Sequence, residues 1–186
     1  MEGVLRSAWD AFYFFAIACV LSENQLKLVL ESHNLVIENF ERRKNMIYTD
    51  SQLKEKIVRM IESFENEVVE FKEARTNYSF NDIGKYFSAL SNEANLRGLQ
   101  EAWLIFGISD DKRYVGTEFR KQGSLQSLKK EIVNGTNERL TFLEIYELTM
   151  EKCRVIAFQI PPAIRGIPTT WQGAAYAREH ESISPL

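Results

Sequence analysis

The 186-residue sequence predicts an α+β fold, with a mixed sheet and flanking helices. Short apolar or alternating runs, typical of strands, are interleaved irregularly with segments whose apolar residues recur at helical spacing. The composition, 45% hydrophobic and 26% charged, is that of a globular protein with one core. The irregular order of strands and helices argues against a doubly wound nucleotide-binding fold, in which the two alternate regularly.

Residues 1–45 are predicted to form a helical extension ahead of the domain at 46–186. An unbroken run of eleven apolar residues, Ala11–Leu21, is shorter than the roughly 20 needed to cross a bilayer. The run suits a buried helix, although it also has the length of a signal-peptide core. Because the stretch from Met46 resembles a natural protein start, the extension is interpreted as lineage-specific or as an upstream start.

The first half of the domain alternates helices and strands. Thr49–Gln52 has the spacing of a capping box and opens an amphipathic helix. Val68–Lys72 is short, β-branched and aromatic, which predicts a strand. Ser79–Asp82 repeats the capping pattern before a second amphipathic segment, which Gly98 is expected to stop.

The second half is richer in strands. Ala102–Ile108 is a continuous apolar run too short for a helix, so it predicts a buried central strand, followed by a polar turn. A return strand, a helix and three further strands are expected in chain order at Arg113–Val115, Ser124–Asn134, Thr141–Leu148, Arg154–Ile160 and Trp171–Arg178.

Charge restricts how this protein can bind nucleic acid. A net charge of −3 excludes bulk attraction to polyanions, so any such binding requires a local patch. The segment from Lys112 to Lys130 holds six basic residues and one acidic residue. A solvated surface explains that segment equally well. The candidate nucleic-acid-binding residues are Lys72, Lys112, Arg113, Arg120, Lys121 and Arg178. Tyr78, Trp171 and Tyr176 are candidates for base stacking, although packing is the alternative that is favoured for each of them.

Acidic residues gather at two predicted strand ends. Glu65, Glu67 and Glu70 crowd the junction before the first strand, and Asp110 follows the central strand. Converging carboxylates can hold Mg²⁺ or Mn²⁺, but residues five apart on an ideal strand face opposite ways. From spacing alone, solvated surface acids are therefore the favoured interpretation.

Several common sites are excluded. The sequence has no P-loop, no G-x-G-x-x-G after a strand, no H-E-x-x-H and no C-x-x-C. Two cysteines and two histidines make neither a disulfide framework nor a His-rich metal site. We therefore expect a reducing, cytoplasmic setting.

Five blocks in register resemble the Schlafen AlbA_2 domain family over about residues 50–186. The first is an E-x4-E-F-K pattern, and the second is similar to that family's "SAFAN" helix. The third resembles its L-x-x-G-V-x-D strand and turn, the fourth its I-P-P strand exit, and the fifth its closing segment. The blocks lie at Glu65–Lys72, Asp82–Asn95, Trp103–Asp111, Ile160–Ala163 and Gly166–Ser182.

The resemblance implies an Alba-like domain of the DNA-binding type, which in bacteria is often the N-terminal module of a transcriptional regulator. In the Schlafen branch, similar domains are endoribonucleases. That likeness implies Glu65, Glu70 and Asp110 as catalytic residues and metal ligands, with Mg²⁺ or Mn²⁺ as cofactor. A third hypothesis is a non-catalytic module that forms a homodimer or senses a ligand.

Overall fold

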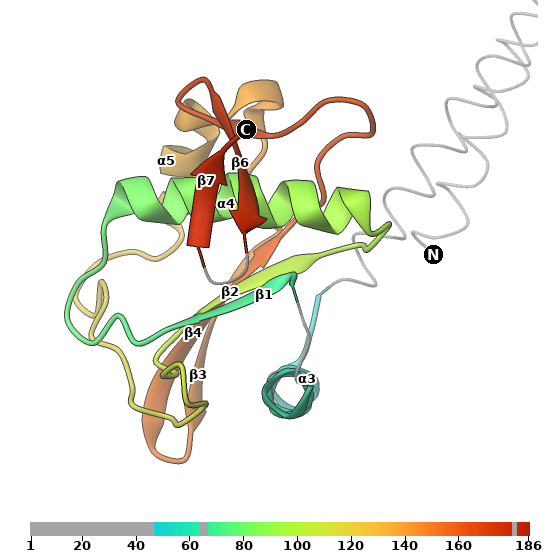
Figure 1. The fold of residues 1–186 in the computed structure, drawn as a ribbon. Helices are drawn as coiled ribbons and strands as arrows, with labels where there is room; N and C mark the ends of the chain where they lie inside the picture. The colour runs from blue at the N-terminus through green and yellow to red at the C-terminus, as the bar shows by residue number, and fades with distance from the viewer. Residues whose placement is uncertain (1–46, 64–66, 180–181) are drawn as a thin grey trace, which may run out of the picture. The chain divides into compact units, whose positions relative to one another are not determined.

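A computed structural model describes residues 47–63, 67–179 and 182–186. The helical extension predicted at residues 1–45 lies outside this part of the chain. Within it, the α+β class is confirmed, because helices pack on both faces of a mixed sheet (Figure 1). None of the helices described there is long and apolar enough to cross a bilayer.

Four strands form the main sheet, in the order β1-β2-β4-β3. The strands β1 and β2 are parallel, whereas β2 pairs with β4, and β4 with β3, in antiparallel register. Every residue of β2 is buried, as expected for the central strand. The edges of the sheet are β1 and β3. The bounds are β1 Val69–Lys72, β2 Ala102–Phe106, β3 Glu144–Met150 and β4 Cys153–Ile160.

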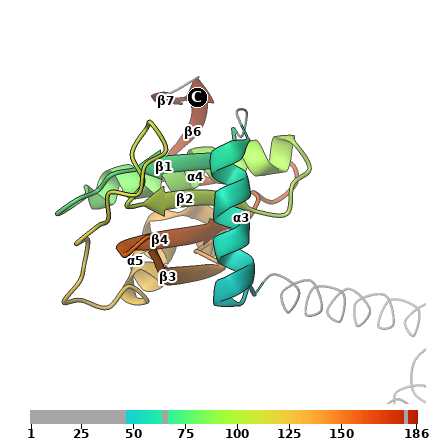
Figure 2. The same ribbon diagram turned by 90° about the horizontal axis from the view of Figure 1, so that it is seen from below.

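Helix α3 (Asp50–Glu62) lies across the strands on one face of this sheet (Figure 2). It begins at the predicted capping box, in which the Thr49 hydroxyl and the Gln52 side chain each accept a backbone N–H of the other residue. The helix buries Leu53, Ile57 and Met60. The opposite face carries α4 (Phe80–Leu96) and α5 (Ser127–Gly135).

Helix α4 packs through two different sides. Its apolar residues, among them Ile83, Phe87 and Leu90, are fully buried in the core. Another side presents buried polar groups to the C-terminal segment: Asn92 accepts from the Thr169 N–H at 2.7 Å and donates to the Thr169 carbonyl at 3.0 Å. The Asn92 amide also donates to the carbonyl of Tyr176 at 3.1 Å. These bonds stabilise the C-terminal segment against α4, since buried main-chain groups need partners.

The C-terminal segment forms a small sheet of its own, with the order β5-β6-β7. The single strand predicted over Trp171–Arg178 is therefore wrong. Gln172 and Gly173 both have positive φ, 49° and 87°, and make a turn that separates β5 from β6. The bounds are β5 Thr170–Trp171, β6 Ala174–Glu179 and β7 Ser182–Pro185. Similarly, the predicted return strand at Arg113–Val115 is reduced to one isolated bridge, between Ile108 and Tyr114.

Trp171 fills a slot between α4 and α5. It is 2% exposed, and its indole N–H donates to Asn81 Oδ1 at 2.7 Å. Glycines make room for the ring on both helices: a Cβ would lie 2.1 Å from ring atoms at Gly84 and 2.2 Å at Gly135. Trp171 is therefore a core residue: its burial agrees with the packing alternative and removes it as a candidate for base stacking.

We predict that Gly84→Ala destabilises the protein despite the better helix propensity of alanine. That propensity favours the variant by about 1 kcal/mol in a helix interior. Overpacking typically costs about 1–3 kcal/mol, and a rigid indole ring wedged between two helices moves with difficulty. Urea denaturation should therefore show a net loss of stability. Gly123→Ala is the control, because its Cβ would meet nothing closer than 3.7 Å. Equal midpoints for the two variants would contradict this packing.

Candidate functional site

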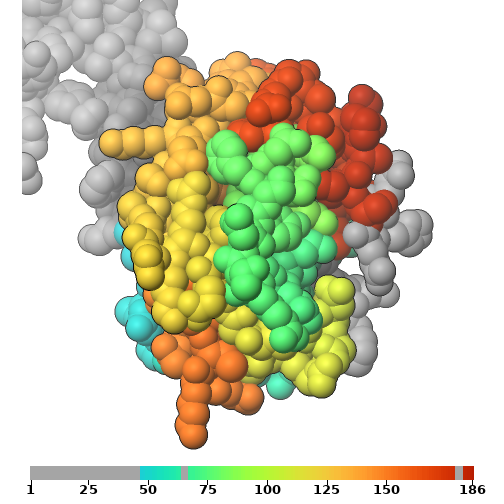
Figure 3. Space-filling view, turned by 90° about the vertical axis from the view of Figure 1, so that its left-hand side faces the viewer, coloured from blue at the N-terminus to red at the C-terminus, as the bar shows by residue number. Residues whose placement is uncertain are grey.

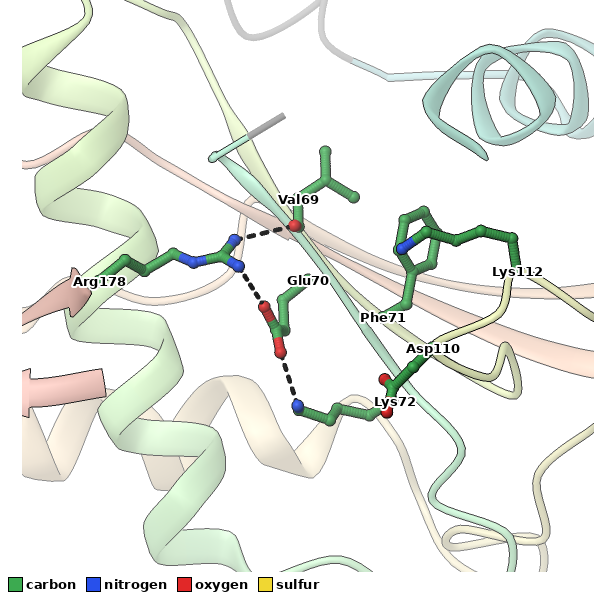
Figure 4. Close-up of a pocket in the computed structure, with 7 residues that line it drawn as sticks. All are labelled: Val69, Glu70, Phe71, Lys72, Asp110, Lys112 and Arg178. Carbon is green, nitrogen blue, oxygen red and sulfur yellow. Dashed lines mark hydrogen bonds and ion pairs between the residues drawn. The ribbon is translucent and has the colours of Figure 1, made fainter. Parts of the chain in front are cut away.

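A polar pocket of about 200 Å³ opens beside the edge strand β1. Its walls come from β1, from the turn that follows β2 and from β6 (Figure 4). Seven residues line it: Val69, Glu70, Phe71, Lys72, Asp110, Lys112 and Arg178. Five of these seven side chains are charged, which distinguishes the pocket from the apolar cavities that enclose uncharged ligands.

The register of β1 decides which groups reach the pocket. The carbonyls of Val68 and Lys72 accept hydrogen bonds from the backbone N–H groups of Trp103 and Gly107. The backbone carbonyls of even-numbered residues therefore point toward β2. The Val69 carbonyl faces the open edge instead, where Arg178 Nη1 donates to it at 2.9 Å. Arg178 thus satisfies main-chain groups that an edge strand otherwise leaves unpaired.

Glu70 lies between two cations. Its Oε1 is 2.6 Å from Lys72 Nζ, and its Oε2 is 2.7 Å from Arg178 Nη2. Lys72 is two residues along the same strand, so both side chains project from one face of the sheet. The glutamate is only 7% exposed, and a carboxylate buried to that degree requires such partners.

Lys72 keeps its charge at neutral pH. Burial alone lowers the pKa of its ammonium, but the hydrogen bond and the negative charge of Glu70 outweigh burial and raise the pKa above its ordinary value. The ammonium also lies 5.1 Å from the centre of the Tyr86 ring. The pocket therefore carries a permanently charged lysine beside a buried carboxylate.

A tight turn after β2 brings two more charged residues to β1. Gly107 begins it with φ of 92°, and a Cβ there would lie 2.6 Å from the carbonyl oxygen of Arg154. Only glycine fits this close approach. The turn closes through the Ser109 N–H, which donates to the Arg113 carbonyl at 3.0 Å. Asp110 and Lys112, within the turn, line the pocket.

Lys112 supplies a cation that is not neutralised locally. Its Nζ lies 4.2 Å from the centre of the Phe71 ring, and no acidic side chain in the described ranges forms an ion pair with it. Its φ of 64° lies in the left-handed region, which is uncommon for a residue other than glycine. Asp110 is exposed at the pocket and likewise has no ion-pair partner among the residues that the structure describes. Three cations and two carboxylates therefore line the pocket, with Lys112 beside Phe71, across β1 from Glu70 (Figure 4).

The other predicted basic residues lie outside the pocket, each in an ion pair of its own. Arg113 pairs with Asp111 at 2.5 Å, and Lys121 pairs with Glu118 at 2.8 Å. Hydrogen bonds from Ser109 and Arg113 lower the pKa of Asp111 below its ordinary value.

Arg120 forms more contacts than Arg113 or Lys121. Its guanidinium binds both oxygens of Glu131, each at 2.7 Å, and its Nη1 also donates to the Ser127 hydroxyl at 2.9 Å. The structure therefore gathers Lys72, Lys112 and Arg178 around one pocket and leaves Arg113, Arg120 and Lys121 outside it.

Only two of the three predicted acidic residues lie in the part of the chain that the structure describes. Glu70 and Asp110 line the same pocket, whereas Glu65 lies outside the described residues. Over the ranges that the structure covers, no group of three His, Cys, Asp or Glu side chains is placed to hold a metal ion. The stacking candidate Tyr78 is half-buried, with its ring centre 4.8 Å from that of Phe106.

Figure 3 shows the surface of the side that faces left in Figure 1. The segment that follows β1 and opens α4 (green) lies between the segment after β2 (yellow) and the C-terminal strands (red). The tip of the β3–β4 hairpin (orange) projects from the same view, at a distance from the C-terminal strands. The exposed charged residues at the hairpin tip serve as controls for the charged residues of the pocket.

A comparison with protein families agrees with the sequence pattern. The family model described as Schlafen, AlbA_2 matches residues 65–186. The chain is similar to the DIP2311 protein from Corynebacterium diphtheriae, with 17% identity and a TM-score of 0.46, over 72% of this chain and 27% of that protein. It thus spans about a quarter of that relative.

A second similar structure is that of a single domain. It is the N-terminal domain of a putative ATP-dependent DNA helicase RecG-related protein from Nitrosomonas europaea, with 17% identity and a TM-score of 0.42. The match covers 69% of this chain and 89% of that domain. A search of curated proteins found no significant match.

We predict that Arg178→Lys destabilises the protein although it keeps the charge. Arg178 Nη1 binds the carbonyls of Glu67 and Val69 while Nη2 binds Glu70, and the single nitrogen of a lysine cannot occupy both positions. Hydrogen bonds to charged groups contribute about 1.5–3 kcal/mol each, so the free energy of unfolding should fall by at least about 1 kcal/mol.

Urea denaturation checks this prediction, with Arg165→Lys as the matched control. Arg165 is exposed, and the structure gives it no ion pair within the described ranges, so its variant should stay within about 0.5 kcal/mol of the wild type. Equal stabilities for the two variants would show that the guanidinium of Arg178 is not a required contact.

Proposed function

The chain belongs to the Schlafen AlbA_2 family, and from that premise we propose that it is a nucleic-acid-binding domain. The pocket beside β1 binds phosphate, and the bases remain outside it. At a finer level, we propose that the domain binds DNA as a module of a bacterial transcriptional regulator in the cytoplasm.

The observation that carries this proposal is that Lys72, Lys112 and Arg178, which are distant in the sequence, all line one pocket. They come from β1, from the turn after β2 and from β6, so the fold assembles a cationic site that the acidic composition of the chain conceals. Since phosphate contacts supply most of the non-specific affinity for nucleic acid, a local group of cations is sufficient for binding.

The basic residues outside the pocket can extend this surface. The side chains of Arg113 and Lys121 are 78% and 59% exposed, and exposed ion pairs contribute only about 0–1 kcal/mol. A phosphate can therefore take the place of Asp111 or Glu118 at little cost. Arg120 is less available, because it binds Glu131 with both terminal nitrogens.

We predict that Lys112→Gln weakens binding to an oligonucleotide and lowers its salt dependence. For duplex DNA, the slope of log K against log salt should fall by about 0.9, because the variant neutralises one phosphate fewer. Fluorescence anisotropy over a salt series measures both quantities.

Lys152→Gln is the matched control. Lys152 is also exposed, also has a left-handed φ, 67° against 64° for Lys112, and lies at the tip of the β3–β4 hairpin. Its variant should bind like the wild type. The same loss of affinity in both variants, or an affinity that does not respond to salt, would contradict a phosphate site at the pocket.

A second candidate function is a metal-dependent endoribonuclease, favoured by the presence of Glu70, Asp110 and Lys72 at one pocket. A bound Mg²⁺ or Mn²⁺ would polarise a phosphodiester and activate water. The described residues supply two carboxylates, and Glu70 is already engaged by two cations, so they do not complete a metal site without Glu65. This candidate therefore ranks below binding alone.

If the protein is a nuclease, we predict that Glu70→Gln abolishes Mn²⁺-stimulated cleavage of structured RNA while binding persists. Glutamine keeps the size of the side chain but removes the charge that a metal ion requires. Gel analysis of labelled tRNA, with Mn²⁺ or EDTA, measures cleavage beside anisotropy for binding.

Glu151→Gln, on the exposed hairpin tip, serves as the control and should cleave like the wild type. Cleavage by Glu70→Gln at the wild-type rate would identify a contaminating nuclease and exclude this candidate.

A further inference from the structure

We propose that the outer edge of strand β3 pairs with the same strand of a second copy of this chain, which joins two four-stranded sheets into one. The inference goes beyond the proposed function and is independent of it, because β3 contributes no residue to the polar pocket. It follows from the main-chain groups on this edge, from the charges beside them and from the position of the β3–β4 hairpin.

The hairpin turn determines which main-chain groups of β3 face outward. Met150 pairs with Cys153 across a two-residue turn, in which Glu151 and Lys152 have φ of 46° and 67°. Positive φ at both central residues is typical of the type I′ turn, and the residues on either side of such a turn are hydrogen-bonded to each other. Because hydrogen-bonded positions alternate along an antiparallel pair, even-numbered residues of β3 bond to β4 and odd-numbered residues direct their N–H and C=O groups outward.

Side chains satisfy only the first part of this outer edge. The Ile145 N–H donates to Glu144 Oε1 at 2.9 Å, and the Ile145 carbonyl accepts from Gln126 Nε2 at 3.4 Å. Glu147 and Thr149 are exposed, and within the described ranges no donor or acceptor bonds to their outward main-chain groups. Their N–H and C=O groups therefore form an open template for a further strand. The opposite edge of the sheet differs, because a guanidinium from β6 covers it.

The charge at this edge does not prevent pairing. Glu147 lies at the centre of the open stretch, and its Oε1 is 2.8 Å from Arg154 Nε. Arg154 belongs to the neighbouring strand β4, and its side chain is only 15% exposed, so the cation stays beside the glutamate. This local neutralisation weakens the charge with which edge strands commonly keep other strands away.

A two-fold pairing centred on Leu148 satisfies the open groups of both copies. Glu147 then lies opposite the partner's Thr149, and the two residues exchange their N–H···O=C bonds. A pairing centred on Glu147 would place two glutamates opposite each other and would need the main chain of Ile145, which is already satisfied. A pairing centred on Thr149 would place Glu147 opposite the partner's Glu151. Like charges directly opposite are destabilising, so the register centred on Leu148 is the complementary one of the three.

A second copy is the occupant because this edge is complementary to itself. Two-fold dimers are the commonest assemblies of soluble proteins, and they place one surface against the same surface. The hairpin tip projects from the domain, so two hairpins can approach side by side (Figure 3). The open stretch is short, and we therefore expect a weak, reversible dimer, with a dissociation constant of about 10–1,000 µM.

Analytical ultracentrifugation of the full 186-residue chain, over a concentration series that reaches about 1 mM, measures this association. Thr149→Pro removes the N–H that the partner's Glu147 accepts, and proline is tolerated on an edge strand where the N–H faces solvent. The variant removes half of the main-chain bonds in the dimer, so its dissociation constant should rise at least about tenfold. Thr149→Val is the matched control, because it changes the same side chain and keeps the N–H. It should associate like the wild type.

Cross-linking tests the register, and it decides the question even if the proline variant fails to fold. The natural cysteines are first removed by Cys19→Ser and Cys153→Ser, and chains with Glu147→Cys are then mixed with chains with Thr149→Cys and mildly oxidised. Hydrogen-bonded antiparallel positions have Cα atoms about 5.5 Å apart, within the range that a disulfide spans. The mixture should give a covalent dimer, whereas each variant alone should give little.

Three results would overturn the inference. The first is a wild-type chain that stays monomeric at about 1 mM, and the second is association that Thr149→Pro weakens no more than Thr149→Val does. The third is a covalent dimer that either cysteine variant forms alone as readily as the mixture, because the strands would then not pair in the proposed register. None of these results bears on nucleic-acid binding, which anisotropy measures separately.

Discussion

The arrangement of the pocket depends on the guanidinium of Arg178, which joins the C-terminal sheet to the edge of the main sheet. An edge strand leaves carbonyls without partners, and a buried carboxylate requires positive charge. Arg178 meets both requirements, since it binds the Val69 carbonyl and Glu70 together. The planar, forked geometry of arginine makes this possible, because it directs several N–H donors along fixed directions.

Helix α4 determines where that guanidinium can lie. Its apolar residues pack in the core, and Ser88 and Asn92 bind the backbone of the C-terminal segment, so the helix fixes β6 relative to β1. The site therefore depends on buried polar contacts distant from it along the chain. The turn after β2 adds Lys112 independently, through the close approach of Gly107 to the Arg154 carbonyl.

Local features could be predicted from the sequence, and long-range ones could not. The capping box at Thr49 and the apolar run of β2 are encoded by adjacent residues, and both are confirmed. The sequence favours packing for Trp171, but the slot that buries it could not be predicted, because it is made by glycines on two different helices. Likewise, basic residues that are close in the sequence, such as Lys112 and Arg120, do not share the pocket, because acidic neighbours such as Glu131 bind some of them. The pairing of Glu70 with Lys72 was accessible, since positions two apart on a strand share a face.

The position of Arg178 also has a consequence for solubility. A strand edge with exposed N–H and C=O groups is a template for pairing with a strand from another molecule, and proteins commonly protect such edges with charge. In this chain the protecting group comes from β6, in the small C-terminal sheet. Proteolytic removal of that sheet would uncover β1 and leave Glu70 with one fewer counter-ion. The side chain that shapes the pocket therefore also covers the edge of β1, where a strand from another molecule would otherwise pair.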